Sequence, residues 1–232
     1  MSKSTQRWLI IGNSGSGKST LANEIITQYR RQHAVTHLVM QSTDAPGRSD
    51  MAAHARKAIT ITRALADKGI DYETLIRRYG SIYVEYEHRS PEQMDALSAA
   101  VLKLGNTLVV TDEAQRIKGA DALANTVDLH TRGRKFGVHT LDITLSLKQR
   151  KDNGVHPVVL QEATTLITFS QFERHNVQHV TEAFPELSAE QLRQLKNPLD
   201  GLPEYAVRHN LTGRSELYLR EQIIDISGGA AM

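Results

Sequence analysis

The feature that most constrains this chain is a glycine-rich segment near its amino terminus. Residues 12–19 read Gly-Asn-Ser-Gly-Ser-Gly-Lys-Ser, the pattern G-x-x-x-x-G-K-S, and they directly follow the apolar run 8–11. A strand that leads through such a turn into a helix directs backbone amides and a helix amino terminus at a phosphate group. The apolar positions that follow have the three- and four-residue spacing of one helix face: Leu21, Ala22, Ile25, Ile26 and Tyr29. The sequence therefore predicts a phosphate-binding loop between a buried strand and an amphipathic helix.

The ligand predicted for this loop is a nucleoside triphosphate, ATP, with Mg²⁺. Lys18 would reach the β- and γ-phosphates as a point charge, and the Ser19 hydroxyl would bind the metal. The alternative is a glycine-rich turn without a nucleotide, which the order of strand, loop and helix disfavours. The nucleotide-binding residues that we expect are Gly12, Asn13, Ser14, Gly15, Ser16, Gly17, Lys18, Ser19 and Thr20.

Two adjacent acids indicate what the nucleotide is for. The buried strand predicted at 107–111 is followed directly by Asp112 and Glu113. Asp112 fits an acid that holds Mg²⁺ through water, and Glu113 fits a base that orients and deprotonates an attacking water. A kinase that phosphorylates a metabolite has less need of the second acid, so the pair favours ATP hydrolysis coupled to motion. The alternative is that the two carboxylates only cap the helix that follows.

Composition limits the remaining possibilities. The 232 residues suit one α/β domain, and the formal net charge of +2 is too small to indicate a general nucleic-acid-binding surface. The chain has no cysteine, which excludes disulfides and cysteine-based zinc sites. No apolar stretch approaches the roughly 18 residues of a membrane span, and the amino terminus lacks the apolar core of a signal peptide. We therefore expect a soluble intracellular protein without a transmembrane segment.

Strand-like and helix-like stretches alternate along the chain, which predicts an α/β fold with a mostly parallel sheet between helices. A short hairpin is expected near the carboxyl terminus. The expected strands are 36–40, 81–86, 107–111, 138–145 and 165–169, the expected helices are 51–65, one opening at Pro91, and 120–135, and the expected hairpin pairs 204–209 with 216–219.

Two helix starts carry the sequence pattern of a capping box, in which the side chains of the first and fourth residues bond the opposite backbone amides. These pairs are Ser90 with Gln93 and Ser188 with Gln191. We expect a single domain over residues 1–232, with a core at about 7–170, a helical and hairpin appendage at about 171–226, and a flexible tail at 227–232.

The acid pair and a basic turn together resemble a known superfamily. Asp112-Glu113-Ala114, a helix, and then Gly133-Arg134-Lys135-Phe136-Gly137-Val138-His139 before a strand look like the HerA/FtsK superfamily of DNA-translocating ATPases. The resemblance also includes the phosphate-binding loop and, more weakly, residues 165–169. It implies a RecA-like P-loop NTPase core with further strands between the loop strand and the acids. Within the superfamily, the compact size resembles the genome-packaging ATPases of tailless, membrane-containing viruses.

The resemblance implies an ATP-driven translocase of double-stranded DNA that ignores base sequence and works as a homo-oligomer, a hexameric ring. It further implies a location in the host cytoplasm or at the packaging vertex of the virion, where a portal or capsid-vertex membrane protein would be a partner. Two alternatives stay open. One is an assembly or secretion ATPase of the filamentous-phage type, or another HerA/FtsK-like DNA pump. The other is a small-molecule P-loop kinase.

The resemblance also assigns roles to basic residues. Arg134, with Arg132 as its competitor, would be an arginine finger that reaches the γ-phosphate held by a neighbouring subunit. The alternative is that these cations only complement the dipole of the preceding helix. A second cluster, Lys148, Arg150 and Lys151, would contact DNA phosphates, or else serves only solubility.

One position departs from the superfamily pattern. A glutamine usually ends the strand after the basic turn and senses the γ-phosphate, but the corresponding residue in this sequence is Leu145. Thr144 and Ser146 flank it, and the nearest glutamine is Gln149. Either the register slips or a hydroxyl does the sensing.

Overall fold

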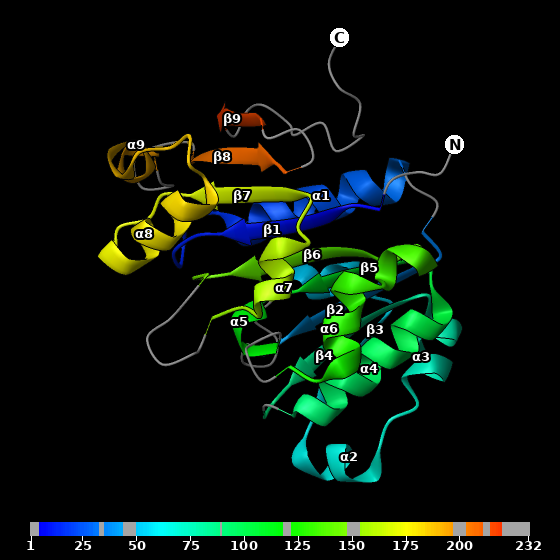
Figure 1. The fold of residues 1–232 in the computed structure, drawn as a ribbon. Helices are drawn as coiled ribbons and strands as arrows, with labels where there is room; N and C mark the ends of the chain where they lie inside the picture. Colours follow the sequence, from blue (N-terminus) through cyan, green and yellow to red (C-terminus); the bar gives the residue numbers. More distant parts are fainter. Residues whose placement is uncertain are drawn as a thin grey trace.

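One sheet of nine strands runs through the protein, in the order β3-β4-β2-β5-β6-β1-β7-β8-β9 (Figure 1). The computed structural model describes residues 5–32, 35–43, 50–88, 90–117, 122–147, 154–196, 203–210 and 214–219. Strands β1 to β7 pair in parallel, and β8 and β9 extend the sheet as an antiparallel hairpin next to β7. The predicted α/β class, with its mostly parallel sheet and carboxyl-terminal hairpin, is confirmed.

The elements alternate along most of the chain. The strands are β1 (Arg7–Ile11), β2 (His37–Ser42), β3 (Lys57–Ile61), β4 (Ser81–Tyr86), β5 (Thr107–Thr111), β6 (His139–Thr144), β7 (Thr165–Phe169), β8 (Glu204–His209) and β9 (Arg214–Leu219). The α-helices are α1 (Lys18–Gln32), α2 (Arg63–Lys68), α3 (Tyr72–Tyr79), α4 (Pro91–Leu104), α5 (Ala114–Ile117), α6 (Ala124–Thr131), α7 (Pro157–Gln161), α8 (Arg174–Ala183) and α9 (Ala189–Gln194). Two 3₁₀ turns are η1 (Asp50–His54) and η2 (Gly133–Phe136).

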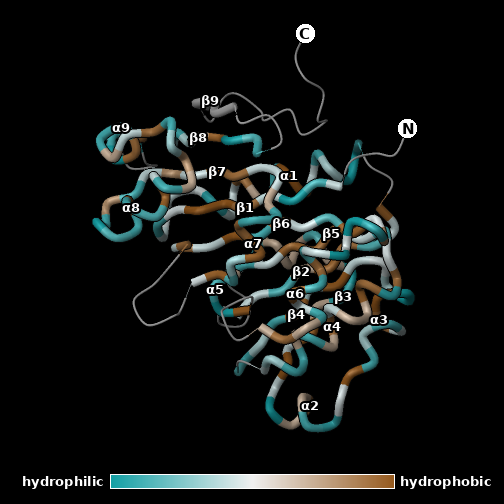
Figure 2. Tube along the Cα trace, viewed as in Figure 1, coloured by the Kyte–Doolittle hydropathy of each residue, from teal (hydrophilic) through white to brown (hydrophobic). Residues whose placement is uncertain are grey.

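Both faces of the sheet are buried, which is why β1 and β5 are mostly apolar, although the central strand β6 also buries His139 and Asp142 (Figure 2). On one face, Trp8 and Ile10 of β1 pack with Ile25 and Tyr29 of α1. The alternate side chains of β1, such as Leu9, face the opposite side and belong to the cluster formed with α7, α8 and α9. A third cluster joins β2, β4 and β5 to α3, α4 and α6. The predicted apolar face of α1 is therefore confirmed.

The strand order determines what meets at the carboxyl edge of the sheet. Strand β6 lies between β1, which leads to the phosphate-binding loop, and β5, which leads to the two acids. Strand β2 pairs with the other side of β5. Because parallel strands end at the same edge, the loop, the acids and the end of β2 lie along one border of the sheet. Of the further strands expected between the loop strand and the acids, the sheet places one, β6, between β1 and β5.

The helix predicted over 51–65 is wrong. That stretch contains η1, then β3, and only then the start of α2. Its alanines and leucine have helical spacing, but Lys57–Ile61 includes three β-branched residues and pairs in parallel with β4. The outer edge of β4 would otherwise leave its backbone groups without strand partners, so tertiary pairing overrides the local helical pattern.

The helix predicted over 120–135 is also partly wrong. A short helix, α5, follows the acids at once, α6 ends at Thr131, and η2 makes a tight turn into β6. Gly133 explains the break, because a Cβ at this position would lie 3.2 Å from the Val138 side chain. The close approach lets the chain reverse and begin β6 at His139 rather than at the predicted residue 138.

Of the two predicted capping boxes, one is confirmed. Ser188 and Gln191 exchange both hydrogen bonds at the start of α9, at 2.9 and 3.1 Å. Ser90 makes no side-chain cap at the start of α4, although Pro91 occupies the first turn as predicted. Gln93 instead donates to the Ala66 carbonyl oxygen at 3.0 Å, and so joins α4 to α2.

Among the described residues, no helix is long and apolar enough to cross a membrane. The tail predicted at 227–232 lies outside the described residues.

Candidate functional site

The phosphate-binding loop lies between β1 and α1, as predicted. Gly15 and Gly17 have φ values of 75° and 99°, a region that glycine adopts without strain. A Cβ at Gly12 would lie 2.6 Å from the Ser16 hydroxyl, so the loop closes more tightly than a larger residue allows. Its start is fixed to strand β6, because the Gly12 amide donates to the Thr144 carbonyl oxygen at 3.2 Å.

Lys18 is the principal charge of the loop. It begins α1, is only 8% exposed, and its ammonium donates to the Asn13 carbonyl oxygen at 2.7 Å. Burial lowers the pKa of Lys18 to about 8, although attraction to Asp112 acts in the opposite direction. Because β1 and β5 run in parallel and end at one border of the sheet, the structure brings together the two groups that the sequence predicted to share a site.

Asp112 and Glu113 follow β5 through a strained turn. Glu113 has a φ of 50°, which is unusual for a residue other than glycine and is stabilised here by its neighbour. The Glu113 amide donates to Asp112 Oδ1 at 2.9 Å, and the Arg116 amide donates to the Glu113 carbonyl oxygen at 2.7 Å. These bonds fix the backbone of the turn that carries the two adjacent carboxylates at the sheet edge.

The sequence analysis missed the residues that position Glu113. Thr43, directly after β2, donates its hydroxyl to Glu113 Oε2 at 2.5 Å. Arg116 lies 3.2 Å from the same oxygen and is itself largely exposed. Both contacts define the orientation of the carboxylate. A polar residue at the end of the strand next to the acids is the signal that could have identified Thr43.

The position expected for a γ-phosphate sensor holds an apolar residue, Leu145. Leu145 follows β6 and is partly exposed. The Thr144 hydroxyl lies 2.8 Å from both Gln115 Oε1 and the Ser146 carbonyl oxygen, and the Ser146 hydroxyl donates to Asn176 Oδ1 at 2.6 Å. Both hydroxyls are buried and engaged beneath α5 and α8. Gln149 lies outside the described residues.

Arg134 lies at the opposite, amino edge of the sheet. Turn η2 precedes β6, whose residue Thr140 is in register with Arg7 at the start of β1. The five residues of β1 span about 15 Å at roughly 3.3 Å per residue, so Arg134 and the phosphate-binding loop are on opposite borders. Arg134 therefore cannot reach the nucleotide of its own subunit.

Backbone contacts at the amino edge fix the position of η2, the turn that carries Arg134. The Asn106 amide donates to the Phe136 carbonyl oxygen at 2.8 Å, and a Cβ at Gly105 would lie 2.6 Å from that oxygen. Arg134 is exposed, and no carboxylate of the described residues forms an ion pair with it. Arg132, its competitor, pairs with Asp128 at 3.0 Å on the same helical turn. This contrast favours Arg134 as the cation available to a partner.

Magnesium would have suitable ligands at the carboxyl edge. Ser19 is exposed at the start of α1, and Asp112 follows β5, so a hydroxyl and a carboxylate can supply the oxygen ligands that Mg²⁺ prefers. Among the described residues, no group of three His, Cys, Asp or Glu side chains could hold a metal by itself. A magnesium ion here would depend on nucleotide phosphates for further ligands.

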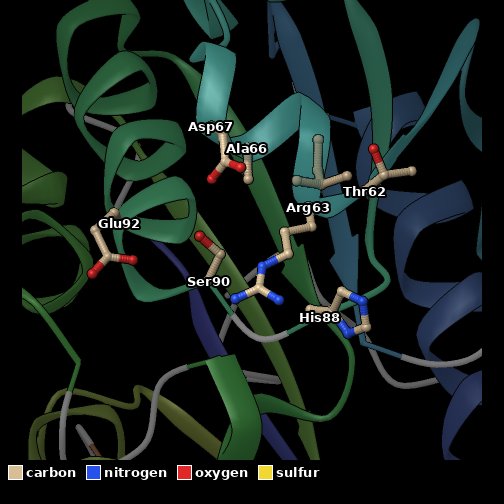
Figure 3. A pocket seen from close by; sticks show the side chains of 8 residues that line it. Thr62, Arg63, Ala66, Asp67, His88, Ser90 and Glu92 are labelled. Atoms are coloured by element: carbon tan, nitrogen blue, oxygen red, sulfur yellow. The ribbon is translucent and has the colours of Figure 1, made fainter.

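A second recess lies at the same edge, over β3 and β4 (Figure 3). Its volume is about 370 Å³, and the Arg63 guanidinium extends into it between His88 and Ser90. Asp67 and Glu92 add negative charge, so its lining is mixed. Four strand spacings separate β4 from β1, about 19 Å, which makes this recess separate from the nucleotide site.

Comparisons with known proteins agree with this geometry. The AAA domain family matches residues 3–150. The genome packaging NTPase B204 from Sulfolobus turreted icosahedral virus 2, in complex with AMPPCP, is 14% identical over 92% of this chain and 97% of its own, with a TM-score of 0.72. B204 from Sulfolobus Turreted Icosahedral Virus, described as a DNA-packaging ATPase, is 15% identical over 93% of this chain and 98% of its own, with a TM-score of 0.66.

A more distant structure is VirB4 of Thermoanaerobacter pseudethanolicus, which is 11% identical over 86% of both chains with a TM-score of 0.53. No sequence among the curated proteins matches. At these identities the similarity establishes the fold, and the predicted resemblance to genome-packaging ATPases is confirmed at that level.

The low pKa of Lys18 predicts a pH dependence of nucleotide binding. The ammonium is charged below about pH 8 and loses its proton above it, so affinity is full at lower pH and falls as the pH rises. The affinity for β,γ-methylene-ATP should fall about tenfold between pH 7 and pH 9, as measured by calorimetry. Lys18→Arg, which stays charged, should bind with an affinity that changes little over this range. A wild-type affinity that is constant to pH 9.5 would contradict the assignment.

Proposed function

The chain belongs to the AAA domain family, and from that premise we propose that it is an ATP-driven translocase of double-stranded DNA that packages a viral genome. That it is a P-loop ATPase follows from the family and from the ATPase fold shared with B204. The observation that carries the finer proposal is the arrangement of its two edges. The carboxyl edge joins the phosphate-binding loop to an acid pair, and the amino edge exposes an arginine that cannot serve its own site.

In the proposed hydrolysis, different residues at the carboxyl edge bind the phosphates, hold the metal and accept the proton. The loop amides and Lys18 bind the β- and γ-phosphates, and Ser19 and Asp112 would hold Mg²⁺, the latter through water. When bound, the metal neutralises charge on the phosphate oxygens. Glu113 accepts a proton from the attacking water, with its carboxylate oriented by Thr43 and Arg116.

Coupling to DNA would use strand β6. Its last residue, Thr144, accepts a hydrogen bond from the Gly12 amide of the loop. The chain then continues within a few residues to Lys148, Arg150 and Lys151, which lie outside the described residues. We propose that these three cations contact DNA phosphates. A conformational change at the phosphate-binding loop would then be transmitted through β6 to the DNA-contacting residues.

The proposed motor is a homo-oligomeric ring of six subunits, in which residues 1–232 act as one ATPase domain. Arg134 would complete the nucleotide site of the next subunit, since its own loop is on the opposite edge. Similarity to B204, which packages DNA, supports a virion or host-cytoplasm setting and a portal or capsid-vertex partner.

DNA should stimulate ATP hydrolysis regardless of its sequence, because a packaging motor grips backbone phosphates rather than base edges. Binding to duplexes of unrelated sequence should weaken steeply with salt. Replacing Lys148, Arg150 and Lys151 by Ala should lower the slope of log affinity against log salt by about 2 to 3, since each phosphate contact contributes about 0.9. Replacing Arg77 and Lys103, both paired with Glu73, removes two cations elsewhere and is the control, which should leave the slope unchanged. Indifference of hydrolysis to DNA would remove the translocase proposal and leave the ATPase.

A mixing experiment tests the composite site. Arg134→Ala and Glu113→Gln proteins should each be nearly inactive, because an arginine finger contributes on the order of 10³ to 10⁵ in rate. Mixed together, they should regain activity at interfaces that pair an intact Glu113 with an intact Arg134. Activity is measured by phosphate release, and subunit exchange is verified by sizing chromatography of differently tagged chains.

Arg132→Ala is the control for this experiment, since its guanidinium is paired with Asp128 and should be dispensable. Loss of activity in Arg132→Ala with complementation by mixing would reassign the finger to Arg132. Full activity of Arg134→Ala alone would contradict a finger at η2.

A further inference from the structure

An exposed aromatic ring lies on the flank of the phosphate-binding loop that the acids do not occupy. Three large apolar side chains are exposed in the described part of the chain: Leu123, Phe136 and Phe172. Phe136 is at the amino edge of the sheet, and Leu123 precedes α6. Phe172, 53% exposed, follows β7, whose end pairs with the end of β1, and is therefore at the carboxyl edge.

The segment that carries Phe172 contacts the loop directly. The Asn13 side-chain amide donates to the Ser170 carbonyl oxygen at 3.3 Å, two residues before Phe172. On the same flank, Phe169 and Pro203 pack behind the loop, 3.6 and 3.5 Å from where a Cβ of Gly17 would lie. Phe169 and Tyr205 are each only 2% exposed and pack on one another, so neither ring has a free face.

The positions of the acids fix the direction of a bound nucleotide. Glu113 follows β5, which lies beyond β6 on one side of β1. Hydrolysis requires the γ-phosphate to face Glu113, so the α-phosphate, ribose and base must leave the loop on the other side. That side is the end of β7, where Phe172 lies.

We propose that Phe172 is the platform on which the nucleotide base stacks. The inference rests on the proposed hydrolytic site only for the direction of the triphosphate, and it does not depend on DNA translocation. Stacking uses the π-face that every base presents, and base–aromatic stacking tolerates any base. Phe172 therefore contributes affinity for the base end of a nucleoside triphosphate without selecting strongly among bases.

The test compares a nucleotide with a ligand that lacks the base. Phe172→Ala should lower the affinity for β,γ-methylene-ATP by about 5- to 150-fold, the range that corresponds to loss of one stacked base. Its affinity for inorganic tripolyphosphate, which fills only the loop, should equal that of the wild type. Phe136→Ala, the same change at a 44% exposed ring on the opposite edge, should leave both affinities unchanged.

A second variant reports stacking without loss of the ring. The chain has one tryptophan, Trp8, which is 2% exposed in the core, so Phe172→Trp adds a distinct exposed fluorophore. Its emission should be quenched by β,γ-methylene-ATP and by the guanosine analogue, but not by tripolyphosphate.

Unchanged nucleotide affinity in Phe172→Ala, or an equal loss for both ligands, would overturn the proposal. Fluorescence emission of Phe172→Trp that is unchanged by the nucleotide would also overturn the proposal. Lys18→Ala separates this failure from that of the site itself. If Lys18→Ala loses both ligands while Phe172→Ala binds normally, the phosphate-binding loop stands and only the base platform is wrong.

Discussion

The parallel register of four central strands is the constraint on which the rest of the structure depends. Because β1, β6, β5 and β2 run in the same direction, the phosphate-binding loop, the acid pair and Thr43 end at one border. Hydrogen bonds across that border then set the details. Gly12 is tied to Thr144, Glu113 to Thr43, and Asp112 to the Gln41 carbonyl oxygen. No single element contains the site, and each strand delivers one part of it.

Much of this was predictable from the sequence because the signals are local. The loop glycines, the buried strand before Asp112 and the capping box at Ser188 depend on neighbours in the chain. The prediction failed where distant partners decide. Lys57–Ile61 is a strand because β4 has an edge to pair, and Gln93 bonds Ala66 rather than its own cap. Thr43 was missed because only the pairing of β2 with β5 brings it to Glu113, 70 residues away.

The two borders of the sheet differ in their charged groups and in how exposed these groups are. The carboxyl edge gathers Lys18 and the carboxylates in partly buried surroundings, where charge interactions are strong. The amino edge presents Arg134 on a turn fixed by Gly105 and Asn106. If Arg134 completes a neighbouring site, as we propose, an isolated subunit would be nearly idle. The proposed division of the site would then give a physical reason for assembly, since only a neighbour could bring the two borders together.

The central claim is that Glu113 activates water at the carboxyl edge. Single-turnover hydrolysis of ATP by Glu113→Gln, alongside its affinity for β,γ-methylene-ATP, measures this most directly. The account predicts a loss of about 10²- to 10⁴-fold in the hydrolysis rate with affinity changed by no more than about twofold. Glu73→Gln, which removes a paired surface carboxylate on α3, should change neither quantity. Hydrolysis by Glu113→Gln at close to the wild-type rate would contradict the account.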